Sequence, residues 1–189
     1  MKTHQMIFSG FGGQGIMLMG QILTQAGLED GRHVSWIPSY GPEMRGGTAY
    51  CSVVVSDDLI GSPVVSAPTL VLAMNLPSKD RFEPALVPGG HLIINSSLIP
   101  EAPARSDIHN HLLPMNEITG RLNNPKVLNM VALGAIYAAA KPVSEEAVFK
   151  AMEVLFGKKF ADKPQLVELN RQAFRAGCEG ILNQAVVTA

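Results

Sequence analysis

The chain has 189 residues, a formal net charge of −1, and only 16% charged residues against 47% hydrophobic ones. This length is enough for one domain with a substantial core, and the balanced charge argues against nucleic-acid binding and against a polybasic membrane patch. So low a share of charged residues favours a surface that is partly buried against partner subunits.

Two cysteines, Cys51 and Cys178, lie far apart, and no C-x-x-C motif occurs. The sequence therefore predicts neither an iron–sulfur cluster nor a structural zinc in this chain, and the absence of a disulfide pattern favours a cytoplasmic location. We expect no signal peptide before the first strand, and no apolar run approaches the ~20 residues that span a membrane.

The first fifth of the chain is predicted to form a strand, a tight glycine turn, a helix and a second strand. The first strand covers about residues 5–9 and the helix about 13–29, with the second strand at 34–37. A strand, a helix and a strand at this spacing predict a parallel pair with a right-handed crossover.

The next part is predicted to be an irregular loop followed by strands. Residues 38–47 contain two prolines and three glycines, so we expect no regular structure there. A strand is expected at 48–56, a turn at 57–58 and a short returning strand at 59–60. The apolar run 69–74 is typical of a buried central strand.

The remaining elements alternate strands with helices and end in a run of helices. They are a helix capped by Ser78 and reaching about Leu86, a strand at 91–95, an edge strand at 108–113, and helices at 116–122, at 126–140 after Asn124 and Pro125, from Ser144 to a break at Gly157, and at 164–183. The whole chain, residues 1–189, is interpreted as a single α/β domain. It is a Rossmann-like three-layer α/β/α domain with a mostly parallel sheet and a helical C-terminal third.

The glycine turn at residues 10–15 fits G-x-G-x-x-G, which suits a phosphate at a helix N-terminus. A nicotinamide site also needs an acidic residue at the end of the second strand, but residues 36–39 contain none and Glu43 lies in the loop beyond. A nucleotide-triphosphate loop needs a lysine and a hydroxyl residue where Ile16 and Met17 stand. The two most common ligands of such a turn are therefore disfavoured.

Two motifs taken together resemble the gamma subunit of 2-oxoacid:ferredoxin oxidoreductases. They are Gly10-Phe-Gly-Gly-Gln-Gly15 and Ser39-Tyr-Gly-Pro-Glu-Met-Arg-Gly-Gly47, and the segment Lys126-Val-Leu-Asn-Met-Val-Ala-Leu-Gly134 is similar as well. The resemblance covers essentially the whole chain, whose length fits a free-standing gamma subunit and marks it as a gamma-type catalytic domain. The second motif is more similar to the pyruvate, oxoglutarate and isovalerate branches than to the indolepyruvate branch.

The resemblance implies a multisubunit enzyme that decarboxylates a 2-oxoacid on thiamine diphosphate, passes electrons through iron–sulfur clusters to ferredoxin, and hands the acyl group to coenzyme A. Thiamine diphosphate, magnesium and the clusters are expected only on partner alpha and beta subunits, with a ferredoxin-like delta subunit as a further candidate. This chain has no Gly-Asp-Gly sequence and no cluster cysteines. Its implied role is to help close the active site and to contribute to coenzyme A binding, and the isolated chain is expected to be inactive.

The candidate cofactor-binding residues come from the two glycine loops and from two asparagines. They are Gly10, Phe11, Gly12, Gly13, Gln14, Gly15, Tyr40, Gly41, Glu43, Arg45, Gly46, Gly47, Asn75 and Asn129. Gln14 is the most informative, because a tight turn alone does not need an amide there, and Arg45 can pair with a phosphate or carboxylate. Contact with a partner chain and a purely local role remain open for both loops.

Four polar residues outside the loops have competing interpretations. Asn75 is predicted at the ligand edge of the sheet, and Asn129 in a buried helix either ties down a loop or contacts a ligand. His109 and His111 alternate on one strand face without a third ligand nearby, so they are predicted to be solvated edge residues, and no metal site is expected.

A stand-alone enzyme that binds NAD or a flavin, and a scaffold subunit without ligand contact, are the alternative functions.

Overall fold

The computed structural model describes residues 2–40 and 48–187, and these form one six-stranded sheet in the order β2-β3-β1-β4-β5-β6. The strands are β1 (Thr3–Phe11), β2 (His33–Tyr40), β3 (Thr48–Ser56), β4 (Leu70–Ala73), β5 (His91–Asn95) and β6 (His109–Leu113). β3 is antiparallel to both β1 and β2, while the pairs β1–β4, β4–β5 and β5–β6 are parallel. The prediction of a mostly parallel sheet is therefore confirmed.

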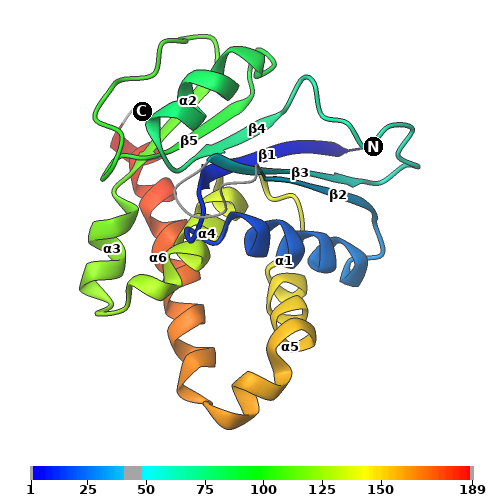
Figure 1. Cartoon of the computed structure of the whole chain (residues 1–189), viewed down its shortest axis with the longest axis vertical. Helices are drawn as coiled ribbons and strands as arrows, with labels where there is room; N and C mark the ends of the chain where they lie inside the picture. The colour runs from blue at the N-terminus through cyan, green and yellow to red at the C-terminus, as the bar shows by residue number, and fades with distance from the viewer. Residues whose placement is uncertain (1, 41–47, 188–189) are drawn as a thin grey trace.

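Helices cover both faces of this sheet, unequally. They are α1 (Ile16–Glu29), α2 (Leu76–Phe82), α3 (Met115–Arg121), α4 (Leu128–Ala140), α5 (Glu145–Asp162) and α6 (Gln165–Val187), with 3₁₀ turns η1 (Glu83–Ala85) and η2 (Pro125–Val127). Figure 1 shows α2 on one face and α1, α4, α5 and α6 on the other. The three-layer arrangement with a helical C-terminal third is confirmed.

The middle of each central strand is apolar because both faces of the sheet pack against helices. In β1, Met6 and Phe8 join the large core beneath α1 and α4, while Ile7 joins the smaller core with Phe82 of α2. Successive side chains of a strand point to opposite faces, and each fully buried large one contributes roughly 1.5–3 kcal/mol. The larger core lies on the face that carries the C-terminal helices.

The predicted adjacent pair of the first two strands is wrong. β3 lies between β1 and β2, and Cys51 of β3 is opposite Phe8 on one side and Pro38 on the other. Residues 38–40 also continue β2, although the sequence predicted irregular structure from residue 38. A proline is tolerated there because β2 is an edge strand, whose outer side has no partner to lose.

Two helix starts were predicted correctly and one was wrong. Asn124 accepts a hydrogen bond from the Lys126 backbone N–H at 3.0 Å, and the Ser144 hydroxyl accepts one from the Ala147 N–H at 3.1 Å. In α2, by contrast, Ser78 is not the cap but lies inside the helix. The Asn75 side chain accepts from the Ser78 N–H at 2.9 Å, so Asn75 is the N-cap.

A predicted strand and a predicted helix break also differ from the structure. Residues 59–60 form no strand, and α5 continues through Gly157, where a break was expected. A glycine inside a helix costs about 1 kcal/mol, and Phe156 and Phe160 on either side pack against the larger core. Their packing keeps this part of α5 helical.

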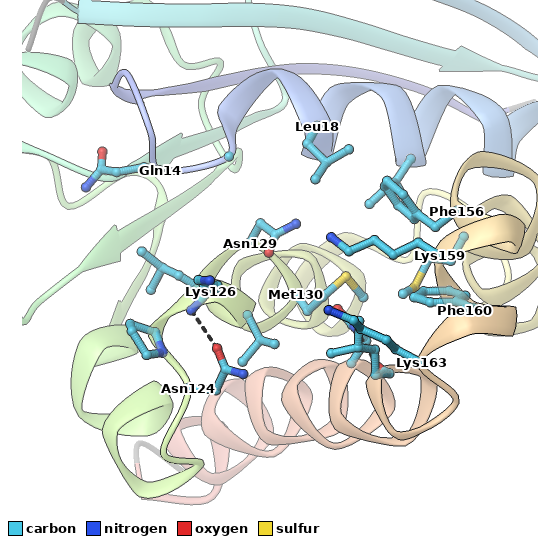
Figure 2. A pocket seen from close by; sticks show the side chains of 18 of the residues that line it. Gln14, Leu18, Asn124, Lys126, Asn129, Met130, Phe156, Lys159, Phe160 and Lys163 are labelled. Atoms are coloured by element: carbon cyan, nitrogen blue, oxygen red, sulfur yellow. Dashed lines mark hydrogen bonds between the residues drawn. The ribbon is translucent and has the colours of Figure 1, made fainter. Parts of the chain in front are cut away.

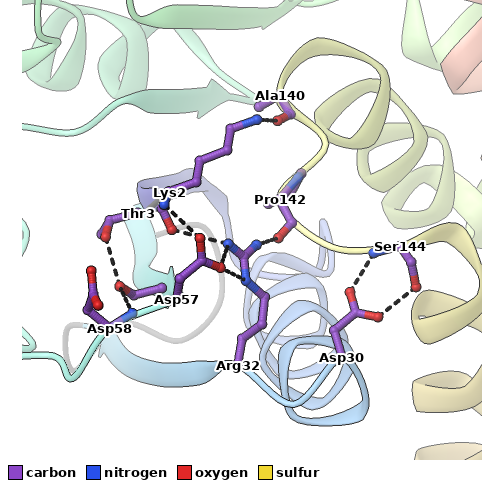
Figure 3. A network of polar contacts seen from close by, with 10 residues as sticks. Lys2, Thr3, Asp30, Arg32, Asp57, Asp58, Ala140, Pro142 and Ser144 are labelled. Carbon is purple, nitrogen blue, oxygen red and sulfur yellow. Dashed lines mark hydrogen bonds and ion pairs between the residues drawn. The ribbon is translucent and has the colours of Figure 1, made fainter.

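Polar contacts join the start of the sheet to the C-terminal helices (Figure 3). The Arg32 guanidinium pairs with the Asp57 carboxylate and donates to a backbone carbonyl in the link between α4 and α5. The Lys2 backbone N–H donates to the same Asp57 carboxylate at 2.7 Å. Beside them, the Asp30 carboxylate accepts from the Ser144 N–H at 2.6 Å and from its hydroxyl at 2.7 Å. These contacts fix where α5 begins relative to α1.

Candidate functional site

A cavity of about 550 Å³ lies between the start of α1, the start of α4, and the α5–α6 pair. Its volume is within the range of small-molecule sites, which is about 300–1,000 Å³. Three lysines line it, Lys126 from η2, Lys159 from α5 and Lys163, which directly follows α5, and we call it the lysine cavity. Gly13, Gln14, and Gly15 form its edge at the glycine turn.

The lysine cavity is positively charged. No aspartate or glutamate among the described residues lines it, and none of its three lysines has an ion-pair partner there. In Figure 2, Lys159 of α5 and Lys163 just after it extend toward Asn129 and Lys126 on the opposite wall. A concave surface with charges of one sign concentrates ligands of the opposite sign, so this cavity is suited to an anion.

The N-terminus of α1 opens beside the lysine cavity. Gly15 is its N-cap, with φ of 79°, and no side chain caps the first turn. Gly13 also has a positive φ, of 97°, which an L side chain rarely adopts. The first backbone N–H groups of α1 therefore lack side-chain acceptors, and together with the helix dipole they favour a phosphate.

Asn129 lies directly against this helix start. A Cβ added to Gly15 would be 2.9 Å from the Asn129 Cβ, so only glycine allows this approach. Asn129 is 8% exposed and lines the lysine cavity, and its side chain makes no hydrogen bond to any described residue. The interpretation that it ties down a loop therefore has no contact to support it. Neither amide atom of Asn129 is fully enclosed without a partner, so the amide is accessible from the cavity and a ligand there could bond to it.

Gln14 has a local role that the sequence did not reveal. Its Oε1 accepts from the Phe11 backbone N–H at 2.7 Å, and its Nε2 donates to the Met74 carbonyl at 3.4 Å. The side chain extends away from the centre of the lysine cavity (Figure 2). The amide thus holds the glycine turn against the end of β4, beside Gly10, where a Cβ would be 2.8 Å from the Met74 Cβ.

The other predicted site residues are divided between the sheet edge and the undescribed loop. Phe11 ends β1 and Tyr40 ends β2, and Asn75 follows β4, so all three lie where the parallel strands end. Asn75 is 3% exposed, and its Nδ2 has no partner among the described residues, but it does not line the lysine cavity. Gly41, Glu43, Arg45, Gly46 and Gly47 lie outside the described residues. The structure therefore brings together Gly13, Gln14, Gly15 and Asn129.

Sequence reasoning missed the three lysines and two aromatic residues of the lysine cavity. Phe156, Lys159 and Phe160 recur at helical spacing, which puts all three on one face of α5, and Lys163 follows as the C-cap of that helix. That signal was present in the sequence, but the predicted break at Gly157 divided it.

One of the two histidines of β6 is more enclosed than predicted. His91 Nδ1 is 3.1 Å from His111 Nε2, and the rings of His91 and His109 stack with centroids 5.0 Å apart. Burial, followed by the charges of His91 and His109, lowers the pKa of His111 to about 4. His109 is exposed as expected, whereas His111 is half-buried, so the prediction of a solvated His111 is wrong.

Within residues 2–40 and 48–187, no three His, Cys, Asp or Glu side chains are grouped to hold a metal ion, and no helix is long and apolar enough to cross a membrane.

Comparison with known proteins gives a family match over nearly the whole chain. Residues 5–180 match the family described as pyruvate ferredoxin/flavodoxin oxidoreductase. The ketoisovalerate oxidoreductase subunit VorA of Methanothermobacter thermautotrophicus is 36% identical over 172 residues, which are 90% of this chain and 35% of that protein. The chain thus spans about a third of the length of this curated relative.

Two solved structures share the fold. The gamma subunit of keto/oxoacid ferredoxin oxidoreductase from Geobacter sulfurreducens PCA has a TM-score of 0.79 and 33% identity, covering 95% of this chain and 99% of that one. The 2-oxoglutarate:ferredoxin oxidoreductase from Magnetococcus marinus, with 2-oxoglutarate, coenzyme A and succinyl-CoA bound, has a TM-score of 0.86 and covers 97% of this chain and 32% of that one. At 22% identity, the second match shows the shared fold alone.

Proposed function

Because the chain belongs to the pyruvate ferredoxin/flavodoxin oxidoreductase family, we propose that it is the gamma-type subunit of a 2-oxoacid:ferredoxin oxidoreductase. The complex oxidatively decarboxylates a 2-oxoacid, transfers the acyl group to coenzyme A, and passes the electrons to ferredoxin. The family match disfavours the stand-alone NAD or flavin enzyme that the glycine turn alone would also allow.

Within that complex, the role of this chain is to bind coenzyme A through its phosphates. The observation that carries the proposal is the lysine cavity, where three unpaired ammonium groups and the open N-terminus of α1 meet. Coenzyme A has a pyrophosphate and a ribose phosphate, so it offers several negative charges to such a cavity. The unpartnered amide of Asn129 adds a neutral hydrogen-bonding group at the same place.

The residues of the lysine cavity hold and orient the ligand, and none of them is assigned a step in the chemistry. Coenzyme A supplies the thiol that accepts the acyl group. The glycine turn lies where the parallel strands end, which is the usual ligand edge of an α/β sheet. A thiol arm that runs along this edge leads out of the chain toward a partner subunit, which would hold the thiamine diphosphate.

Partner subunits complete the active site in this proposal. Alpha and beta chains carry thiamine diphosphate and magnesium, and the iron–sulfur clusters lie on them or on a ferredoxin-like delta chain. Exposed apolar side chains, such as Leu59 at 84% and Val64 at 67% exposure, agree with a surface that contacts other chains.

Two measurements test the proposal. A tagged copy purified from its native cell should bring down chains that carry thiamine diphosphate and iron–sulfur clusters, and recovery of a free monomer alone would contradict the subunit role. Calorimetric titration of the full chain with coenzyme A should give saturable binding that Asn129→Ala or Lys126→Gln weakens roughly tenfold, equal to about 1.4 kcal/mol. Unchanged affinity in both variants would place coenzyme A outside the lysine cavity, and no binding by the wild-type chain would favour the scaffold alternative.

A further inference from the structure

One face of α5 combines aromatic rings with positive charge inside the lysine cavity. Phe156, Lys159 and Phe160 follow the spacing i, i+3 and i+4, so their side chains lie on the same side of the helix, and Lys163, the C-cap of α5, lines the cavity beside them. The rings of Phe156 and Phe160 are 5.8 Å apart at 55°. Both rings are half-buried, and each therefore keeps surface open to a ligand.

These two phenylalanines are the aromatic residues among the described residues that line the lysine cavity. A flat ring system that enters the cavity can therefore stack on α5 but not at the glycine turn. Stacking of a base on an aromatic side chain contributes roughly 1–3 kcal/mol and needs no particular hydrogen-bond pattern. Lys159 stands between the two phenylalanines in α5, and Lys163 follows three residues after Phe160. A phosphate attached close to the base would therefore lie near positive charge.

The opposite wall suits a second phosphate group without an aromatic neighbour. There the first N–H groups of α1 and the amide of Asn129 lie at the glycine turn, and Lys126 of η2 lines the same side of the cavity. In coenzyme A, the 3′-phosphate and adenine share one ribose, whereas the pyrophosphate leads away from that ribose to the pantetheine arm. Only one orientation puts adenine on the aromatic side and the arm at the edge of the sheet.

We propose that the α5 face recognises the 3′-phosphoadenosine end of coenzyme A, with Lys159 and Lys163 as the residues that select for the 3′-phosphate. The pyrophosphate then lies at the N-terminus of α1, and the arm leaves past Gly13. This inference rests on the proposed function, since it assigns direction and selectivity to the same site.

The test compares coenzyme A with dephospho-coenzyme A, which lacks only the 3′-phosphate, by calorimetric titration of the full chain. Wild type should bind coenzyme A at least tenfold more tightly. In Lys159→Gln/Lys163→Gln, that ratio should fall close to one while the affinity for dephospho-coenzyme A stays the same, which also shows that the variant is folded. Lys158→Gln is the matched control, because Lys158 is an exposed neighbour on α5 that does not line the cavity.

The outcomes separate the two proposals. Equal binding of both compounds by wild type, or a preference that survives in the double variant, would overturn the selectivity and leave coenzyme A binding intact. Failure of both compounds to bind would overturn the proposed function itself. A second variant, Phe156→Leu/Phe160→Leu, should weaken both compounds by the same factor, and selective loss of coenzyme A alone would contradict the stacking role of the rings.

Discussion

The backbone of Gly15 lies so close to Asn129 that a Cβ on Gly15 would be 2.9 Å from the Asn129 Cβ. Gly15→Ala therefore adds two costs, the strain of an alanine at φ of 79° and the displacement of Asn129. The strain alone is about 1–2 kcal/mol. We expect a lower thermal unfolding midpoint and weaker coenzyme A binding, measured by calorimetry.

Gly31→Ala is the control for this prediction. Gly31 has a similar φ of 69°, but an added Cβ would have open space around it. It should therefore lose stability through strain alone and bind coenzyme A as wild type does. Equal stability losses at Gly15 and Gly31, with binding intact in both variants, would show that the contact with Asn129 has no effect on the site.

The crossing of α4 and α6 should be intolerant of a single methyl group. A Cβ on Gly134 would overlap the Phe174 carbonyl, and a Cβ on Gly177 would overlap the Val131 carbonyl. Backbone atoms cannot change position as easily as a side chain changes rotamer. Each alanine variant should therefore lose about 3 kcal/mol of unfolding free energy, measured by urea titration. Gly157→Ala in α5, where the Cβ meets open space, should instead gain about 0.5–1 kcal/mol. Equal behaviour of the three variants would contradict this account of the crossing.

Sequence patterns predicted most elements of this fold because the strands and helices have strong local signals. The β-branched residues of 48–56 and the apolar run before Asn75 each predicted a strand at nearly the observed place. The order of the strands was not predictable in the same way. A strand followed by a helix and a strand has the same local pattern whether or not a third strand later inserts, and β3 does insert between β1 and β2.

The candidate site was predictable only on the side of the glycine turn. Gly15 and Asn129 could each be selected from their own surroundings, but their contact joins residues far apart in the chain. Lys159 and Lys163 are typical of a solvated helix face when seen alone. The predicted break at Gly157 hid the spacing that Lys159 shares with Phe156 and Phe160, and the packing that brings the end of α5 opposite Lys126 of η2 has no local signal at all.

The stability of the chain should fall as the pH is lowered from about 6.5 to about 4. Burial lowers the pKa of His4 and of His111 to about 4 in the folded chain, so between these values the unfolded state binds more protons. The stabilising contribution of these two neutral histidines is complete above their unfolded-state pKa of about 6.5, and it is lost as the pH falls toward 4. His111→Gln should flatten this part of the urea-midpoint profile, whereas His33→Gln, at an exposed position, should not. An unchanged slope in the His111 variant would refute the assignment.

A separate acid transition should come from Asp57. The Lys2 backbone N–H and then the Arg32 guanidinium lower the pKa of this carboxyl below its ordinary 3.8. Its stabilising effect is therefore present at neutral pH and is lost as the pH falls through the lowered value. Asp57→Asn should lower the unfolding midpoint at pH 7 and remove this step. Asp58→Asn, at the neighbouring exposed carboxylate, should leave both unchanged.

The insertion of β3 also has a consequence for the order of folding. The β2-β3-β1 half of the sheet and α1 are formed by residues 3–56, so their pairings join segments close in the chain and can form early. The bonds from Asp30 to Ser144, by contrast, span 114 residues. During synthesis, the apolar side of α1 that α5 covers therefore stays exposed until α5 has been made. We expect incomplete chains to aggregate before this late docking step.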